Sequence, residues 1–405
     1  MATMTEPPAE TFRLSQLIYD TRYRSLTIQV VAFILIMAGL FWLASNTVQN
    51  LQSLGKDFNF GFLGQRAGYD INQRLVEYTN DSTHARAALV GILNTLLVAF
   101  VGCIIATIVG VIAGVLRLSN NWIVARLMAV YVEGFRNIPT LLWILIVFAI
   151  MTEATPQPRD FRGDDPEASM ILFDTVAITN RGIYTPAPVW GDGALMLVLV
   201  FIASLVGIWA FRRYARKRQE QTGDILPVFW TSLGLFFIPS ILFYFILGRP
   251  VTLEYPELTG FNFSGGTHMR NSFIALTLAL ALYTGAFIAE NVRSGILAVS
   301  KGQTEAAFAL GLRPNRTMNL VILPQALRVI IPPLISQYLN LTKNSSLAIA
   351  VGYMDVRSTL GGITINQTGR ELEGMLLLGL FYLITSLIIS SLMNVYNSSI
   401  KLKER

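Results

Sequence analysis

A short segment between two apolar runs has the residue types of an element that contacts a soluble partner. Glu305 is followed by two small residues, Ala306 and Ala307, and then by Gly311. Residues Thr304 to Leu310 favour a short helix, and Gly311 can adopt the positive φ that ends a helix. Arginines just after this stretch keep it on the wet side of a membrane. We therefore predict a surface helix that plugs into a soluble protein.

A second group of polar residues lies inside the apolar run that follows. Pro332 and Pro333 are expected to break this span early. The polar residues in its middle are Gln337, Asn340, Thr342, Lys343, Asn344, Ser345 and Ser346. Polar structure at membrane depth is tolerated only where protein or a wet cavity surrounds it, and a buried ammonium such as that of Lys343 can receive a carboxylate. The group predicts the lining of a substrate path, although hydrogen bonding between helices or a place near the outer surface would also explain each residue.

A third polar group interrupts the apolar run from Leu127 to Met151 near its start. Glu133, Arg136 and Pro139 lie there. Proline removes a backbone hydrogen bond, and Glu133 and Arg136 are spaced to pair on one helical face. We predict a structural break in this span, located inside the bundle or at the membrane interface rather than against lipid.

The sequence contains no motif for catalysis or for nucleotide binding. No Gly-x-x-x-x-Gly-Lys-Ser/Thr occurs, so the chain should not cradle ATP phosphates. His84 and His268 fall in expected outer loops, too far apart in sequence to suggest a metal pair, and are predicted to be surface residues. Cys103 is the single cysteine, which excludes an intrachain disulfide and a cysteine metal cluster. We predict no enzymatic activity, no metal site and an external energy source.

The composition indicates an integral membrane protein. Hydrophobic residues make up 53% of the chain and charged residues only 14%, against roughly 25% charged in a soluble domain. The net charge of +6 fits the Lys and Arg excess of cytoplasmic loops, without the aromatic and basic interleaving of a nucleic-acid binder. Nucleic acid is therefore excluded as a partner, and the lipid bilayer is expected.

Eight apolar runs are predicted to span the membrane with both termini inside. They are Leu26 to Ala44, Ala87 to Leu116, Leu127 to Met151, Ala194 to Phe211, Leu226 to Leu247, Asn271 to about Ala298, Leu327 to about Tyr353, and Met375 to Tyr396. Five positive charges between Arg212 and Arg218 mark the loop joining the two middle runs as cytoplasmic. The acidic residues gather in the expected outer loop, as Asp160, Asp164, Asp165, Glu167, Asp174 and Asp192.

The runs divide the chain into three parts. Residues 1–86 form an N-terminal tail, a first span and an outer loop, residues 87–396 form the transport domain, and residues 397–405 form a cytoplasmic tail. Residues 152–270 are expected to be an insertion of outer loops and an extra helical hairpin, in which the part after Arg249 has turn residues but no regular pattern. In the second run, Gly110 and Gly114 form a Gly-x-x-x-Gly pair suited to close helix packing.

The motifs around these runs resemble the bacterial polar amino-acid ABC permeases. The matching stretches are Glu290 with Arg293 to Ile296, Lys301 to Ala307, Ala309 to Leu312, Ile322 to Ala326, Gly91 to Leu96 and Phe135 to Leu141. The loop motif is typical of type I importers, and its extended forms Glu-x-x-Arg-x-Gly-Ile and Gly-Gln-x-Glu-Ala-Ala narrow the resemblance to amino-acid systems. The insertion resembles one of the two permease subunits of the glutamate/glutamine/aspartate/asparagine or general amino-acid systems of Gram-negative bacteria.

The resemblance implies an all-α transmembrane domain of about eight helices in the bacterial inner membrane, moving polar L-amino acids by alternating access. The implied partners are a second permease subunit, two ATP-binding subunits that hold ATP and Mg, and a periplasmic amino-acid-binding protein; this chain would bind no cofactor. A heterodimer of permeases is expected, although a homodimer would serve the same mechanism. The residues implied for ATPase coupling are Thr304, Glu305, Ala306, Ala307, Gly311 and Leu312, with Glu305 in the ATPase groove, the alanines permitting close approach and Gly311 supplying the turn. Asn94 and Thr95 join the implied substrate path with Lys343, Asn344, Ser345 and Ser346.

Other classes of protein fit less well. A permease for another small polar nutrient is the nearest alternative, and the transported solute would distinguish it. An ion-coupled secondary transporter should show repeated halves and intramembrane carboxylates, whereas Glu133 and Glu290 fall near the expected cytoplasmic ends. A membrane-embedded enzyme would need a cluster of His, Asp or Glu within the spans.

Overall fold

The computed structural model describes residues 16–53, 55, 57–163 and 165–400. The chain divides into two compact units, residues 1–65 and residues 66–405. Among the predicted features, the N-terminal tail before residue 16, Asp164 and the last five residues of the C-terminal tail lie outside the described residues.

The first unit contains the short helix α1 (Gln16–Tyr19), the long helix α2 (Thr21–Ser53) and the 3-10 turn η1 (Gly61–Gly64). The apolar run predicted for Leu26 to Ala44 lies within α2, which extends beyond it at both ends because the flanking residues are polar but include no proline or glycine. The stretch Tyr23–Ser53 is long and apolar enough to cross a membrane.

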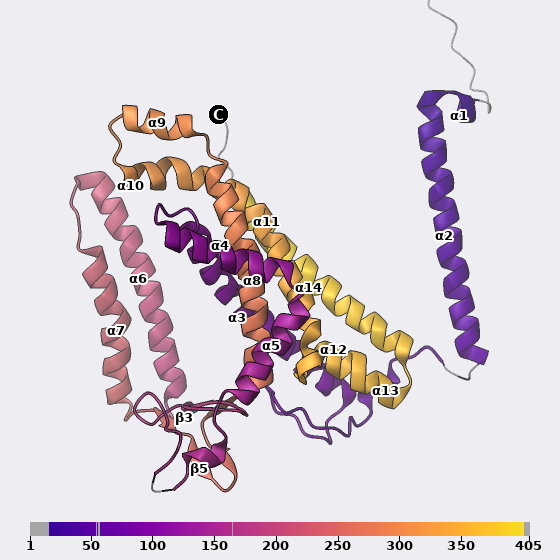
Figure 1. Ribbon diagram of the computed structural model, residues 1–405, viewed down its shortest axis with the longest axis horizontal. Coiled ribbons are helices and arrows are strands. Elements are labelled where there is room, and N and C mark those ends of the chain that lie inside the picture. Colours follow the sequence, from indigo (N-terminus) through magenta and orange to yellow (C-terminus); the bar gives the residue numbers. More distant parts are fainter. Residues whose placement is uncertain (1–15, 54, 56, 164, 401–405) are drawn as a thin grey trace, which may run out of the picture. The chain divides into compact units, whose positions relative to one another are not determined.

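The second unit is built from helices, with a small β framework at one end (Figure 1). Its helical elements are α3 (His84–Leu116), α4 (Trp122–Asn137), α5 (Thr140–Glu153), η2 (Pro158–Phe161), α6 (Ala194–Thr222), α7 (Val228–Ile246), α8 (Asn271–Leu297), α9 (Lys301–Ala309), α10 (Pro314–Thr317), η3 (Met318–Ile322), α11 (Leu323–Asn344), η4 (Ser345–Val351), α12 (Val356–Ser358), η5 (Thr359–Thr364), α13 (Ile365–Thr368) and α14 (Glu371–Ile400). Over the described part of both units, eight helices are long and apolar enough to span a membrane, as the sequence predicted.

The centre of this unit is the packing of α3 against α8. A Cβ on Gly110 would lie 2.6 Å from Ile288 Cβ, and a Cβ on Gly114 would lie 2.7 Å from the carbonyl oxygen of Ala289. Only a residue without a side chain permits this approach. The predicted role of the glycine pair in close helix packing is therefore confirmed, and α8 becomes the helix around which the buried apolar cluster forms.

The predicted third span is two helices rather than one broken helix. α4 ends at Asn137, Ile138 is extended with φ −109° and ψ 135°, and Pro139 precedes the first residue of α5. The residue before a proline avoids helical geometry, which turns the expected break into a complete separation. Only the stretch beginning at Thr140 is long and apolar enough to span, so the run from Leu127 to Met151 was placed too early.

The seventh span does not break at Pro332 and Pro333, contrary to the prediction. Both prolines lie inside α11, which continues to Asn344. Prolines are tolerated in membrane helices because neighbouring helices and local adjustments satisfy the freed carbonyl groups. The irregular structure instead lies at the two ends, as the π-helical η3 before α11 and the 3-10 turn η4 after it.

The insertion contains regular β structure that the sequence did not suggest. Its strands are β1 (Ala177–Thr179), β2 (Gly182–Thr185), β3 (Ala187–Trp190), β4 (Val251–Glu254), β5 (Glu257–Thr259), β6 (Asn262–Ser264) and β7 (Thr267–Arg270). They form a three-stranded sheet β1-β2-β7 and the two-stranded sheets β3-β4 and β5-β6, with every pairing antiparallel. The strands are too short for an alternating pattern to stand out, and the partners in the β2-β7 and β3-β4 pairings are far apart in sequence.

The sheets hold the extra hairpin α6–α7 at its base. β3 directly precedes α6, β4 follows α7, and Trp190 pairs with Val251 across them. The basic residues Arg212 to Arg218, expected in a loop, lie on α6, which continues to Thr222 and ends at Gly223 with φ +76°. Arginine and lysine are good helix formers, so the basic run continues the helix instead of interrupting it.

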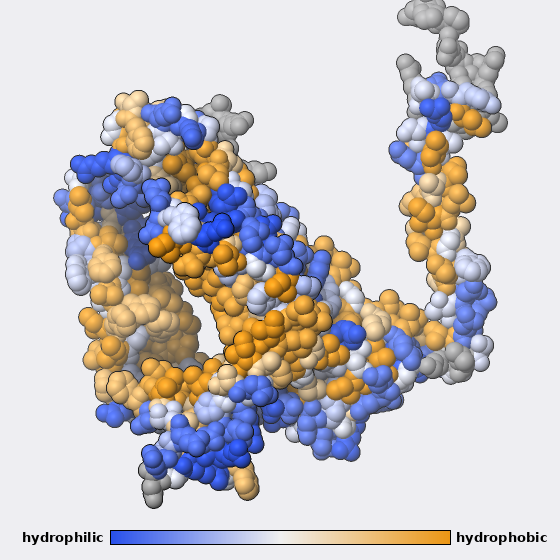
Figure 2. All heavy atoms as spheres, viewed as in Figure 1, coloured by the Kyte–Doolittle hydropathy of each residue, from blue (hydrophilic) through white to orange (hydrophobic). Residues whose placement is uncertain are grey.

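Figure 1 shows α9, α10 and the α6–α7 connection at one end of the second unit, with the three sheets at the other. We call these the α9 end and the sheet end. Figure 2 shows hydrophobic side chains along the helices and hydrophilic side chains gathered at the sheet end. This distribution is that of a membrane-spanning bundle with water-exposed ends.

Candidate functional site

The segment predicted to dock on a soluble partner forms α9, which begins at Lys301 and ends at Ala309. Gly311 has φ +74°. Its N–H donates to the carbonyl oxygen of Phe308 at 2.9 Å, and the N–H of Leu312 donates to that of Ala307 at 3.1 Å. These two bonds form the Schellman motif, which satisfies the last carbonyl groups of a helix. The predicted turn at Gly311 is confirmed.

The exposed face of α9 carries Glu305 and Ala306, whereas Ala307 points into the protein and is only 4% exposed. Ala307 therefore packs α9 against its own chain and is not free to let a partner approach, which corrects one part of the sequence interpretation. Thr304 is half-buried, and the large side chains Phe308 and Leu310 are exposed. Apolar side chains next to a carboxylate on a short helix form a surface suited to a protein groove.

α9 is connected to the spanning helix α11 through several short elements. The Gln325 side chain donates to the Gln303 side-chain oxygen at 3.4 Å, which links α9 directly to the beginning of α11. Pro314 opens α10, and Thr317 at its end is buried. α9 is thus joined to α11 by this hydrogen bond and, after the turn at residues 310–313, by the consecutive helical elements α10 and η3.

A charged cluster lies where the ends of α3, α4 and α8 meet. The Arg117 guanidinium donates to carboxylate oxygens of Glu290 and, at 3.0 Å, of Glu133, and Arg293 donates to Glu290 at 2.6 Å. The predicted pair of Glu133 with Arg136 does not form. The Arg136 guanidinium instead lies 5.3 Å from the centre of the Phe287 ring.

This cluster could be found only in part from the sequence. Glu290 and Arg293 are one helical turn apart, and their pairing follows from that spacing. Arg117, which binds both carboxylates, follows the end of α3, and nothing in its local sequence indicates a partner on α8. The cluster links the ends of three helices by ion pairs.

Asn94 and Thr95, expected on a substrate path, are fully buried and hold a loop of their own chain. The Asn94 amide donates to the carbonyl oxygens of Gln73 and Met354 at 2.8 and 2.9 Å. The Thr95 hydroxyl accepts the N–H of Val356 at 3.0 Å. In this conformation the two side chains position the segment after η4 and are not open to a solute.

That segment contains a buried carboxyl group. Asp355 is 0% exposed. Its Oδ1 accepts the N–H of Ser358 at 2.8 Å, and this hydrogen bond caps the beginning of α12. Burial raises the pKa of Asp355 to about 6, while hydrogen bonds from Ser358 and the charge of Arg357 offset part of the effect. Asp355 was not singled out in the sequence, because a lone aspartate in a loop carries no pattern.

The polar residues at the end of α11 differ in exposure. Lys343 is exposed, Asn344 and Ser346 are half-buried, and Ser345 is fully buried. The hydroxyl groups of Ser345 and Ser346 donate to carbonyl oxygens one turn earlier, at 2.7 and 2.8 Å. Among the ion pairs of the described residues, none involves Lys343.

The two histidines are not the surface residues that the sequence suggested. His84 begins α3 and is 2% exposed, and its Nδ1 lies 3.0 Å from the hydroxyl of Thr364. His268 is half-buried on β7, with its ring stacked on Tyr184 at a centroid distance of 4.1 Å. The structure shows no group of His, Cys, Asp and Glu that could hold a metal within the part of the chain it describes.

These features define a multi-span membrane protein with a docking helix in one of its water-exposed loops. A family model described as binding-protein-dependent transport system inner membrane component matches residues 207–402. The glutamate/glutamine/aspartate/asparagine transport system permease protein of Rhodobacter capsulatus is 58% identical over the full length of both chains. The general L-amino acid transport system permease protein of Rhizobium johnstonii is 44% identical over 96% of this chain and 94% of that protein.

The chain therefore belongs to the family of inner-membrane permease subunits of amino-acid ABC importers. The family, the transport class and the type I transmembrane fold predicted from the sequence are confirmed, with the small sheets as an addition to the helices. The protein is a multi-pass protein of the inner membrane, and a permease of this kind implies ATPase and binding-protein partners.

Proposed function

We propose that this chain is one of two permease subunits of an importer for polar L-amino acids, with glutamate, glutamine, aspartate and asparagine as the preferred group. The observation that carries the proposal is the full-length 58% identity to a permease of a system named for these four amino acids. The 44% identity to a general L-amino acid permease supports a polar amino-acid class and leaves a broader range of substrates within it.

ATP hydrolysis takes place in two separate ATP-binding subunits, which hold ATP and Mg, and this chain binds no cofactor. Its α9 end faces the cytoplasm, and both chain termini are on that side. The basic residues between Arg212 and Arg218 on α6 and the arginines around α10 support this orientation, because Lys and Arg concentrate on the cytoplasmic side. The sheet end then faces the periplasm, where a binding protein delivers the amino acid.

The coupling step is the docking of α9 on an ATP-binding subunit. Glu305 binds in the groove of that subunit, Ala306 permits close contact, and Gly311 with Leu312 fixes the end of the helix. When ATP draws the two ATP-binding subunits together, each pulls on one α9, and the movement passes to α11 through the Gln303–Gln325 bond and η3. The Arg117–Glu290–Arg293 cluster makes α3 and α8 follow as one body.

The path of the amino acid runs between the two permease subunits. Lys343 and Ser346 lie at the end of α11, and the exposed ammonium of Lys343 can bind a substrate carboxylate once the second permease excludes water. Asn94 and Thr95 join the path only if the segment that they hold moves during the cycle. Pro139 separates α4 from α5, while Glu133 contacts Arg117 at the end of α3 and Arg136 contacts Phe287 of α8, so both hold the end of α4.

The experiment is reconstitution of the complete complex in proteoliposomes with the binding protein outside and ATP inside. Uptake of radiolabelled glutamate, glutamine, aspartate and asparagine is compared with that of arginine and of a dipeptide. The proposal expects ATP-dependent uptake of the first four and its loss in Glu305→Ala, whereas Gly302→Ala, on the same helix and in open space, should keep it. Uptake of another polar nutrient in preference to all amino acids would contradict the proposal.

A further inference from the structure

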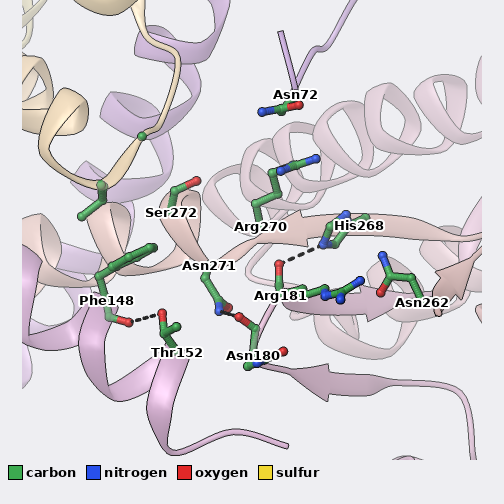
Figure 3. Close-up of a pocket in the computed structure, with 12 residues that line it drawn as sticks. Asn72, Phe148, Thr152, Asn180, Arg181, Asn262, His268, Arg270, Asn271 and Ser272 are labelled. Carbon is green, nitrogen blue, oxygen red and sulfur yellow. Dashed lines mark hydrogen bonds between the residues drawn. The ribbon is translucent and has the colours of Figure 1, made fainter. Parts of the chain in front are cut away.

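A polar pocket of about 460 Å³ lies at the sheet end, between the insertion and the core helices (Figure 3). Strand β7, the first residue of β6 and the turn before β2 contribute from the insertion. The beginning of α8, the end of α5, Asn72 and the end of η4 complete the lining. The volume falls in the range of small-molecule sites, ~300–1,000 Å³. Hydrogen bonds already fix its walls: the His268 Nε2–H donates to the Arg181 carbonyl oxygen at 3.1 Å, and Thr152 donates to that of Phe148 at 2.8 Å.

The lining is cationic. Arg181 and Arg270 contribute guanidinium groups, and no aspartate or glutamate of the described chain lines the pocket or pairs with either arginine. Burial and the nearby charge of Arg270 lower the pKa of His268, so this ring is neutral at pH 7. A cationic pocket without a counter-charge favours an anionic ligand.

The beginning of α8 adds to this preference. Asn271 is the first residue of this helix, no side chain caps its N-terminus, and Asn271 and Ser272 both line the pocket. The first N–H groups of a helix have no partner within it and carry the positive end of its dipole. They can donate to carboxylate oxygens together with the guanidinium group of Arg270. The exposed Arg181 guanidinium donates to the Phe261 carbonyl oxygen at 3.3 Å and has further N–H groups for a ligand.

The pocket also contains hydrogen-bond acceptors that lack a donor. Asn271 is only 5% exposed, and its Nδ2 donates to the carbonyl oxygen of Asn180. The Oδ1 atoms of Asn271 and Asn180, and the Nε of Arg270, are buried without a hydrogen-bond partner. Buried polar atoms are normally satisfied, so these three point to a ligand that carries both a donor and an acceptor.

We propose that this pocket binds a free α-amino acid, with its carboxylate on Arg270, Arg181 and the α8 N-terminus and its ammonium on the amide oxygens of Asn180 and Asn271. The inference rests on the proposed function, to which it adds a site in the insertion. The pocket would receive the amino acid released by the binding protein before it enters the path between the permeases. Its walls come from both the insertion and the core, so the insertion completes a site that neither forms alone.

The test is direct binding to the assembled complex in nanodiscs without the binding protein. Equilibrium dialysis with radiolabelled L-glutamate and L-glutamine compares the wild type with the double variant Arg181→Gln, Arg270→Gln. Arg162→Gln is the matched control, because Arg162 is exposed on the same insertion and does not line the pocket. We expect the double variant to weaken binding of both amino acids at least about tenfold, as loss of charge-assisted hydrogen bonds implies, and the control to leave it unchanged.

Competition identifies the ligand groups. L-Glutamine should displace glutamate, whereas glutarate, which has no ammonium group, should displace it at least about tenfold less well if the amide oxygens accept from that group. Binding that is absent in the wild type, or equal in the wild type and the double variant, would overturn the pocket even if uptake in proteoliposomes establishes the proposed function. If glutamate and glutamine bind in a way that depends on the Arg181 and Arg270 side chains, but no amino acid is taken up, the pocket is supported and the proposed function is not.

A third measurement separates the pocket from a docking surface for acidic residues of the binding protein. If the double variant keeps its affinity for free amino acids but loses stimulation of ATP hydrolysis by the binding protein, the arginines bind that protein and our proposal is wrong. If direct binding falls and stimulation by the ligand-free binding protein is unchanged, the pocket is a ligand site.

Discussion

The backbone conformation of Gly311 gives the most specific test of how α9 docks on the ATP-binding subunit. Its φ of +74° is in the left-handed region, and a Cβ at this position would have no heavy atom within 4 Å. Gly311→Ala therefore introduces no steric clash within the chain and changes only the cost of the conformation. For a residue with a Cβ, that cost is about 1–2 kcal/mol.

The expected consequence is weaker docking of the ATP-binding subunit. If the subunit recognises α9 with its Schellman motif formed, binding must restore the strained conformation, and the affinity falls by up to about 5–30-fold. Gly311→Asn should lower this affinity much less, because asparagine tolerates positive φ. Gly302→Ala should cost nothing, since Gly302 has helical geometry and open space.

The assay measures binding of the purified ATP-binding subunit to nanodisc-held permease and, in the same samples, the ratio of amino acid imported to ATP hydrolysed. The wild type and Gly302→Ala should bind the subunit with equal affinity, Gly311→Asn more weakly, and Gly311→Ala most weakly. Equal affinity and transport for Gly311→Ala and the wild type would refute the reasoning that the turn at Gly311 shapes the docking surface.

Three further outcomes concern the fold that carries this helix. Gly110→Ala should destabilise the complex by about 1–3 kcal/mol, because its Cβ would be 2.6 Å from Ile288, whereas Gly207→Ala has open space and should not; thermal unfolding in detergent compares them. Glu290→Gln leaves the Arg117 and Arg293 guanidinium groups without their shared carboxylate. It should lower the free energy of unfolding by about 1–3 kcal/mol and lower uptake, and a variant as stable as the wild type would contradict this role of Glu290. Because burial raises the pKa of Asp355 from 3.8 to about 6, its contribution favours the folded state at low pH and is lost as the pH rises from about 4 to about 6. Relative to Asp355→Asn, the unfolding free energy of the wild type should thus fall by about 2 kcal/mol over this range. Parallel pH profiles of the two proteins would contradict this assignment of the raised pKa.

The sequence predicted the elements that depend on local patterns. Apolar runs long enough to span a bilayer, the glycine that ends α9 and the glycine pair on α3 all follow from residue type and spacing within a few helical turns. The break at Pro139 was located correctly for the same reason, although it separates two helices instead of kinking one.

Features that depend on distant contacts could not be predicted in this way. Arg117 binds a carboxylate on α8, and His84 contacts Thr364, yet neither has a neighbour in sequence that indicates its partner. β2 pairs with β7, and β3 pairs with β4, across the whole α6–α7 hairpin, so no hairpin signal marks these two pairings. Asn94 and Thr95 were recognised as important polar residues, but only the tertiary structure shows that they hold a loop.

The central claim, that α9 couples this permease to a separate ATPase, is tested most directly by cross-linking in native membranes. In a Cys103→Ser background, the exposed Ala306 is replaced by cysteine, and the exposed Arg162 at the sheet end is replaced in a parallel variant. With a short bifunctional reagent and mass spectrometry, our account predicts that Ala306→Cys is joined to a protein with a nucleotide-binding sequence and that Arg162→Cys is not. If Ala306→Cys captures no such protein, or if Arg162→Cys captures it equally, α9 is not the coupling element.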